Sequence, residues 1–154
     1  MRIADALADV QRLAIETAPY IYFVEEHPIY AEKVDAILQI AEAAGIEIRS
    51  SVISLTEILI KPIQANDQNL LSAYREMLTE LDMAQLVPVT AHIAEQAAHL
   101  RARYNLRTPD ALHVASALSS RCDAFLTNDM NLKRVEGLRI LILDELDLDS
   151  TETD

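Results

Sequence analysis

The pattern of apolar and polar positions predicts short strands that alternate with amphipathic helices along almost the whole chain. Apolar residues recur at helical spacing between Tyr30 and Ala44, and Gly45 is placed to end that helix. Over residues 46–50 apolar and polar residues alternate, as they do in a strand. Similar patterns predict helices over residues 4–12, 20–24, 69–81, 91–104 and 108–118, a helix from 54 that Pro62 interrupts, and strands over 13–15, 86–89, 124–127 and 138–143.

This order of elements defines the expected fold class. The connections between strands are too long for hairpins, so they must be crossovers, and crossovers produce a mainly parallel sheet with helices on both faces. The prediction is a three-layer α/β/α domain with a mainly parallel sheet of four or five strands. A chain of 154 residues has the length of one domain. We assign residues 1–143 to that single domain and residues 144–154 to an acidic, flexible C-terminal tail.

Charge and composition restrict the function further. The chain carries 25 acidic against 13 basic residues, for a net charge of −12, which argues against broad phosphate binding over the whole surface. No apolar run approaches the ~20 residues of a membrane span and the first residues do not open a signal peptide, so we expect a cytoplasmic protein without a membrane partner. The single cysteine, Cys122, excludes an internal disulfide and receives no functional role.

The stretch from Arg107 to Asp129 joins a well-started helix to an apolar strand. Thr108 is expected to cap the helix with its hydroxyl, Pro109 suits the first helical position, and Asp110 brings charge to the positive first turn. The following strand runs to Thr127 and is closed by Asp129. The carboxyl ends of strands and the adjoining helix starts share the edge of an α/β sheet where ligands bind.

Four acidic residues occupy positions of this kind. Glu16 follows the first strand, Glu57 and Asp110 are expected in first turns of helices, and Asp129 follows the fourth strand. Each also has a local explanation: a capping box with Ser54 for Glu57, the helix dipole for Asp110, a turn for Asp129 and plain solvation for Glu16. Only their joint placement indicates a site, and a hard divalent cation such as Mg²⁺ or Mn²⁺ is the natural partner of converging carboxylates.

The histidines indicate no soft-metal site. His27, His92, His99 and His113 lack the His and Cys spacing of zinc sites. His113 follows Asp110 by one helical turn, and it is expected either to pack in the interior or to pair with that carboxylate.

Four segments together resemble the PIN-domain ribonuclease family, and in particular VapC-type toxins of toxin–antitoxin pairs. Residues 13–25 (LAIETAPYIYFVE) look like the opening of a PIN domain, and residues 54–59 (SLTEIL) are similar to its second acidic motif. Residues 107–115 (RTPDALHVA) and 125–129 (FLTND) resemble the third and fourth. The resemblance covers nearly the whole chain in order.

The resemblance implies a metal-dependent endoribonuclease, a hydrolase that cleaves RNA and acts as the toxin of a type II toxin–antitoxin system. Glu16, Glu57, Asp110 and Asp129 would hold one or two Mg²⁺ or Mn²⁺ ions. Thr17, Thr127 and Asn128 would orient these ligands and a bound water. Implied partners are an RNA substrate such as transfer RNA, a cognate antitoxin that inserts a segment into the acidic groove, and a second copy in a homodimer.

One residue departs from the family pattern. The first acid of the family is ordinarily Asp, whereas this chain has Glu16. The extra methylene displaces the carboxylate by on the order of 1.5 Å, and a misplacement of ~1 Å in a catalytic constellation can cost ~100-fold in rate. The alternative to a nuclease is therefore a catalytically weakened binding protein of the same fold.

A second alternative is a phosphoacceptor signalling domain, which is also α/β. It expects paired acids after the first strand and a lysine after the last, and the sequence has neither.

The final third of the chain offers a basic rim for RNA, formed by Arg101, Arg103, Arg107, Arg121, Lys133, Arg134 and Arg139. Aromatic residues make up 5% of the chain, so extensive base stacking is not expected.

Overall fold

A computed structural model describes residues 1–80 and 84–150. Five parallel strands form one sheet in the order β3-β2-β1-β4-β5. The strands are β1 (Arg12–Ile15), β2 (Glu47–Ser51), β3 (Gln85–Val87), β4 (Ala124–Thr127) and β5 (Arg139–Ile142). The helices are α1 (Ile3–Leu7), α2 (Thr17–Val24), α3 (Ala31–Ala44), α4 (Ile53–Gln64), α5 (Gln68–Arg75), α6 (Ala91–Tyr104) and α7 (Thr108–Ser119). The predicted three-layer α/β/α class and parallel sheet are confirmed.

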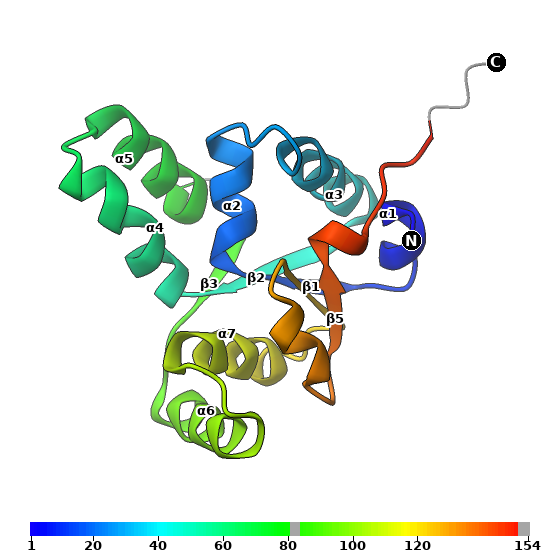
Figure 1. Cartoon of the computed structure of the whole chain (residues 1–154), viewed down its shortest axis with the longest axis vertical. Coiled ribbons are helices and arrows are strands. Elements are labelled where there is room, and N and C mark those ends of the chain that lie inside the picture. Colours follow the sequence, from blue (N-terminus) through cyan, green and yellow to red (C-terminus); the bar gives the residue numbers. More distant parts are fainter. Residues whose placement is uncertain (81–83, 151–154) are drawn as a thin grey trace.

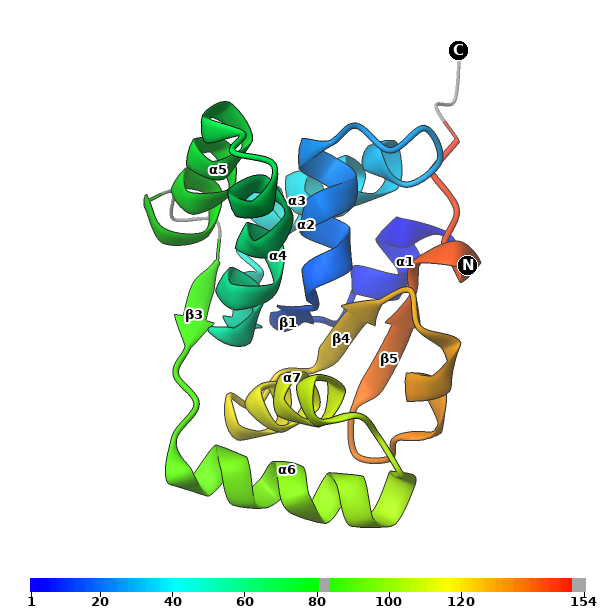
Figure 2. The ribbon, with the colours of Figure 1, turned by 60° about the vertical axis from the view of Figure 1, so that its left-hand side comes forward.

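Two apolar cores cover the two faces of the sheet. Helices α2 to α5 lie on one face and α6 and α7 on the other (Figures 1 and 2). Side chains of the central strand alternate between them, because successive residues of a strand point to opposite faces. Leu13 and Ile15 join the core under α2 and α3, whereas Ala14 joins the core under α6 and α7.

The order in which the strands are added to the sheet reverses beside β1. From β1 the chain moves outward through β2 and β3, then returns across the sheet through α6 and α7 to β4, which pairs with the other side of β1. Helices on opposite faces therefore diverge at the carboxyl ends of β1 and β4. Such a switch point is the general ligand-binding position of open parallel sheets.

Several predicted boundaries are wrong in informative ways. The first helix ends at Leu7, not near residue 12, because Arg12 already pairs with Glu47 in the sheet. Pro62 does not interrupt α4, which continues to Gln64, because the proline ring is buried among the helix's inward residues near its last turn.

Two other segments also differ from the sequence pattern. The helix expected over 69–81 begins at Gln68 and, after Arg75, widens into a π-helical turn over Glu76–Glu80; Leu81 lies outside the described residues. A 3-10 helix, Met130–Arg134, follows Asp129, where the sequence indicates only a short turn or helix. Elsewhere α3, α6, α7 and β4 begin and end within one residue of their predicted limits.

The segment after β5 packs against the start of the chain. A 3-10 turn covers Leu143–Glu145, and Leu146 is buried. The backbone N–H of Asp147 donates to the carbonyl of Met1 at 2.8 Å, and Ile3 N–H donates to the carbonyl of Asp147 at 3.0 Å. The first residues of the predicted tail thus lie beside α1. No helix in the described part of the chain combines the length and the apolar character needed to cross a membrane.

Candidate active site

An open groove of about 520 Å³ lies at the carboxyl ends of the central strands, and all four predicted acids line it: Glu16, Glu57, Asp110 and Asp129. Three elements and the loop after β4 bring them there. Glu16 follows β1, Glu57 lies on α4, Asp110 on α7, and Asp129 two residues after β4. Thr17 and Asn128 also border the groove, whereas Thr127 lies fully buried beneath it.

Glu16 is held in a largely buried position next to other acids. Its backbone N–H donates to the carbonyl of Leu126 at 3.1 Å, and its carboxylate accepts a short hydrogen bond from the Thr127 hydroxyl. Burial raises the pKa of Glu16, and the charges of Asp110 and Asp129 raise it further, against the opposing effect of the Thr127 hydroxyl bond. A carboxylate in this environment gains stability from a nearby cation.

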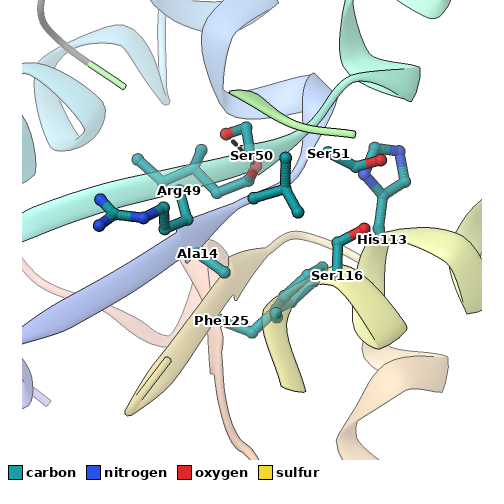
Figure 3. A pocket seen from close by; sticks show the side chains of 10 residues that line it. Ala14, Arg49, Ser50, Ser51, His113, Ser116 and Phe125 are labelled. Carbon is teal, nitrogen blue, oxygen red and sulfur yellow. Dashed lines mark hydrogen bonds between the residues drawn. The ribbon is translucent and has the colours of Figure 1, made fainter. Parts of the chain in front are cut away.

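Glu57 is hydrogen-bonded with polar side chains of two other helices. The imidazole Nε2 of His113 lies 2.5 Å from Glu57 Oε1, and the Thr17 hydroxyl donates to the same oxygen at 2.9 Å. The hydrogen bond with His113 is the main reason that the pKa of Glu57 is lowered, although burial opposes it. Figure 3 shows His113 projecting from α7 toward Ser51 at the end of β2, among polar and apolar side chains of α7 and the central strands.

The local explanation for Glu57 is wrong. Helix α4 begins at Ile53, so Glu57 is its fifth residue and lies beyond the first turn. The predicted capping box is also absent, because the Ser54 hydroxyl is buried and lies 3.1 Å from the Thr17 hydroxyl. His113 is buried as one expectation held, but its partner is Glu57 rather than Asp110.

Asp110 is buried at the start of α7 and pairs with an exposed arginine. Arg107 Nε donates to Asp110 Oδ2 at 3.1 Å, and this bond, followed by the charge of Asp110 itself, raises the pKa of Arg107. Thr108 does not cap the helix as predicted. Arg107 occupies the cap position, and the Thr108 hydroxyl instead accepts from Arg101 at 3.0 Å.

Asp129 has one carboxylate oxygen engaged by the backbone. Its Oδ1 accepts from the N–H of Asn131 at 2.9 Å and caps the short helix after β4. Its own N–H donates to the Thr127 hydroxyl at 3.0 Å, so Thr127 links the first and fourth acids. The predicted turn explanation for Asp129 therefore coexists with its place in the groove.

The donor chemistry of the groove suits a hard divalent cation. The four acidic side chains offer carboxylate oxygens, and neither Cys nor His is among the groove-lining residues. Over residues 1–80 and 84–150, no three His, Cys, Asp or Glu side chains stand close enough to hold a metal ion as a finished cage. Instead, hydrogen-bond donors of the protein contact the carboxylate oxygens. Mg²⁺ commonly uses only one or two carboxylates and retains several waters, so an open acidic groove fits it.

The predicted basic rim does not form around the groove. Of the seven basic residues of the final third, only Arg107 lines it. Arg103 pairs with Glu136, Lys133 with Glu145 and Arg139 with Asp9, all on other surfaces. Positive charge at the groove is therefore concentrated in one exposed guanidinium.

The fold is an open parallel α/β/α domain with four carboxylates at its switch point, a set of donors suited to a hard divalent cation. The family model described as PIN domain matches residues 14–138, and the chain belongs to that family. The matched region contains all four acids. No curated protein sequence matches the chain.

Solved structures share the fold at low identity. A toxin–antitoxin complex from Klebsiella pneumoniae aligns with a TM-score of 0.63 at 20% identity, covering 85% of this chain and 97% of the other. VapBC2 from Rickettsia felis, bound to a DNA fragment from its promoter, gives 0.63 at 16% identity over 85% and 98%. DNA-bound VapBC from Salmonella typhimurium gives 0.64 at 16% identity over 86% and 98%.

Proposed function

We propose that the protein is a Mg²⁺- or Mn²⁺-dependent endoribonuclease, and the toxin of a type II toxin–antitoxin pair in the cytoplasm. The observation that carries this proposal is the convergence of Glu16, Glu57, Asp110 and Asp129 on one groove at the switch point of a PIN domain. The placement of the largely buried Glu16 carboxylate beside Asp110 and Asp129 supports a cation at that position, because a cation would relieve the repulsion among these charges.

In this proposal Glu16, Glu57, Asp110 and Asp129 would supply the carboxylate ligands, with water molecules in the remaining positions, and neighbouring polar groups orient these carboxylates. When bound, the metal would lower the pKa of a water molecule and stabilise the charge that develops on phosphate oxygens. The Thr127 hydroxyl orients Glu16 and the Thr17 hydroxyl orients Glu57. The exposed guanidinium of Arg107 lies at the same groove and supplies positive charge toward the phosphodiester.

Partners are proposed on the same basis. Three solved structures that share the fold are toxin–antitoxin complexes, so we propose a cognate antitoxin that fills the acidic groove, and a homodimer as the assembled toxin. The substrate is RNA, with transfer RNA as one candidate. The acidic surface, with a net charge of −12, favours recognition at the site over broad attraction of phosphates.

Cleavage of labelled cellular RNA by the purified protein tests the activity. The expected result is cutting with Mg²⁺ or Mn²⁺ that disappears with EDTA and in Asp110→Asn. Asp35→Asn is the matched control, because Asp35 lies on α3, outside the groove, and bonds only Gln39 among the described residues. Cutting that survives both EDTA and Asp110→Asn would overturn the proposed function.

The second candidate is a binding protein of the same fold with weakened catalysis. It is favoured by Glu16, whose longer side chain replaces the family's usual Asp and is tied to Thr127. Glu16→Asp separates the two candidates. If the native chain does not cut RNA and Glu16→Asp does, the native protein is the weakened form; if the native chain already cuts, Glu16 is a competent ligand.

A further inference from the structure

Three aromatic rings gather beside the candidate active site. Tyr22 comes from α2, and His27 and Tyr30 from the connection between α2 and α3. The ring centroids of Tyr22 and His27 lie 5.0 Å apart, those of Tyr22 and Tyr30 4.7 Å, and those of His27 and Tyr30 4.7 Å. Such distances are typical of stacked and edge-to-face aromatic pairs. All three rings remain partly exposed.

Hydrogen bonds hold this cluster in place. His27 Nδ1 accepts from the backbone N–H of Ile29 at 3.1 Å and of Tyr30 at 3.2 Å, which fixes the imidazole. The Tyr30 hydroxyl donates to Asp144 Oδ1 at 2.6 Å, and the backbone N–H of Asp144 donates to Asn128 Oδ1 at 2.9 Å. The cluster is therefore tied to a residue that lines the groove, and it is ordered before any ligand binds.

Tyr22 brings the cluster into the groove itself. Together with Ala18 and Ile21, all from α2, it forms an apolar wall of the same groove whose other residues are the four acids, Thr17, Arg107 and Asn128. The groove thus has one charged side suited to a metal-bound phosphate and one aromatic side suited to a flat, weakly polar group. An unpaired nucleotide carries both a phosphate and such a group.

We propose that Tyr22, supported by His27 and Tyr30, is a stacking site for an unpaired nucleobase next to the phosphate held at the acids. This inference rests on the proposed function, and adds the substrate feature that the site reads. Stacking on an aromatic side chain tolerates any base, because every base has a π-face. The site therefore selects single-stranded RNA rather than a particular sequence, and an abasic position opposite Tyr22 should be bound less well.

The size of the effect follows from the exposure of the ring. Aromatic-to-Ala substitutions at stacking sites typically cost about 5- to 150-fold in affinity per base. Tyr22 already packs against two rings and is only partly exposed, so we expect a loss near the low end, about 5- to 20-fold. Tyr22→Phe retains the ring and should bind as the native residue does.

Binding is measured by fluorescence anisotropy in the Asp110→Asn background, which suppresses cleavage, with Mn²⁺ raised more than about tenfold above the concentration that saturates the native protein, to offset the weaker metal binding expected of this variant. The probes are a labelled oligoadenylate and a ribose-phosphate oligomer of the same length that lacks bases. Tyr104→Ala is the matched control, because Tyr104 lies on α6, across the sheet, and does not line the groove. Urea unfolding of every variant verifies that it is folded.

The expected result is that Tyr22→Ala removes most of the preference for oligoadenylate over the abasic oligomer, whereas Tyr22→Phe and Tyr104→Ala preserve it. The base site would be overturned if Tyr22→Ala kept the preference for oligoadenylate, or if the Asp110→Asn protein with Tyr22 intact showed no such preference. Either result is expected if the apolar wall binds a polypeptide and not a base. Cleavage by native protein is scored separately. A Tyr22-dependent preference without cleavage would retain the base site and reject the nuclease.

Discussion

Replacing His113 with alanine should weaken the fold through the candidate site. The His113 side chain is 2% exposed and is hydrogen-bonded with the Glu57 carboxylate, whose side chain is 37% exposed. A hydrogen bond to a charged group contributes about 1.5–3 kcal/mol, and partial exposure of the carboxylate reduces that to about 1–2 kcal/mol. Truncating the buried ring leaves a cavity that adds about 1–2 kcal/mol. We therefore expect His113→Ala to lower the free energy of unfolding by about 2–4 kcal/mol.

The assay is urea unfolding of the metal-free protein at neutral pH, monitored by circular dichroism. His99→Ala is the matched control, because His99 is exposed on α6 and should change stability by less than about 0.5 kcal/mol. A loss of less than about 0.5 kcal/mol in His113→Ala would refute the reasoning, since it would mean that the buried His113–Glu57 pair contributes nothing net.

Three further predictions concern residues that hold the scaffold. Two backbone N–H groups at the start of β1 donate to the Asp123 carboxylate and lower its pKa below the ordinary value of 3.8. Because solvent screens this exposed carboxylate, Asp123→Ala should lower the free energy of unfolding at pH 7 by less than about 1 kcal/mol. A carboxylate whose pKa is lowered by folding stabilises the fold at pH values above its unfolded pKa, and this stabilisation is lost as the pH falls through its folded pKa. The difference in unfolding free energy between the native protein and Asp123→Ala should therefore shrink below about pH 3.8 when measured by urea unfolding, and a constant difference would contradict this. Gly45 ends α3 at φ +69°, so Gly45→Ala should destabilise by about 1 kcal/mol although a Cβ there meets no atom within 4 Å; an increase in melting temperature would show that strain is absent. The Tyr20 hydroxyl shares a 2.6 Å hydrogen bond with the Ser50 hydroxyl, so Tyr20→Phe should lower the unfolding free energy by about 1 kcal/mol, and an unchanged denaturation midpoint would contradict that value.

Most of the fold could be predicted because its elements carry local signals. Apolar periodicity located α3, α6, α7 and β4, and Gly45 marked the end of α3. Connections too long for hairpins then required parallel strands. Where a local signal competed with tertiary packing, packing decided the outcome: buried Pro62 stays inside α4, and Arg12 pairs in the sheet instead of ending a helix.

The candidate site divides in the same way. The four acids could be found because each stands next to a strand or helix that the sequence predicts, and the sheet brings those ends together. The pairing of Glu57 with His113 could not, because 56 positions separate them and only the packing of α4 against α7 makes them neighbours. The aromatic cluster was missed for another reason. A low aromatic content does not reveal that Tyr22, His27 and Tyr30 meet, since their stacking depends on the turn between α2 and α3.

Calorimetric titration of Mn²⁺ into the native protein and into Asp110→Asn tests the central claim most directly. The account predicts saturable binding by the native chain and by Asp35→Asn. In Asp110→Asn it predicts a loss of at least about tenfold in affinity, because a proposed ligand is removed without a change in side-chain size. Mn²⁺ binding of equal strength in the native protein and Asp110→Asn, or no binding by the native protein, would contradict the claim that the acidic groove is a metal site.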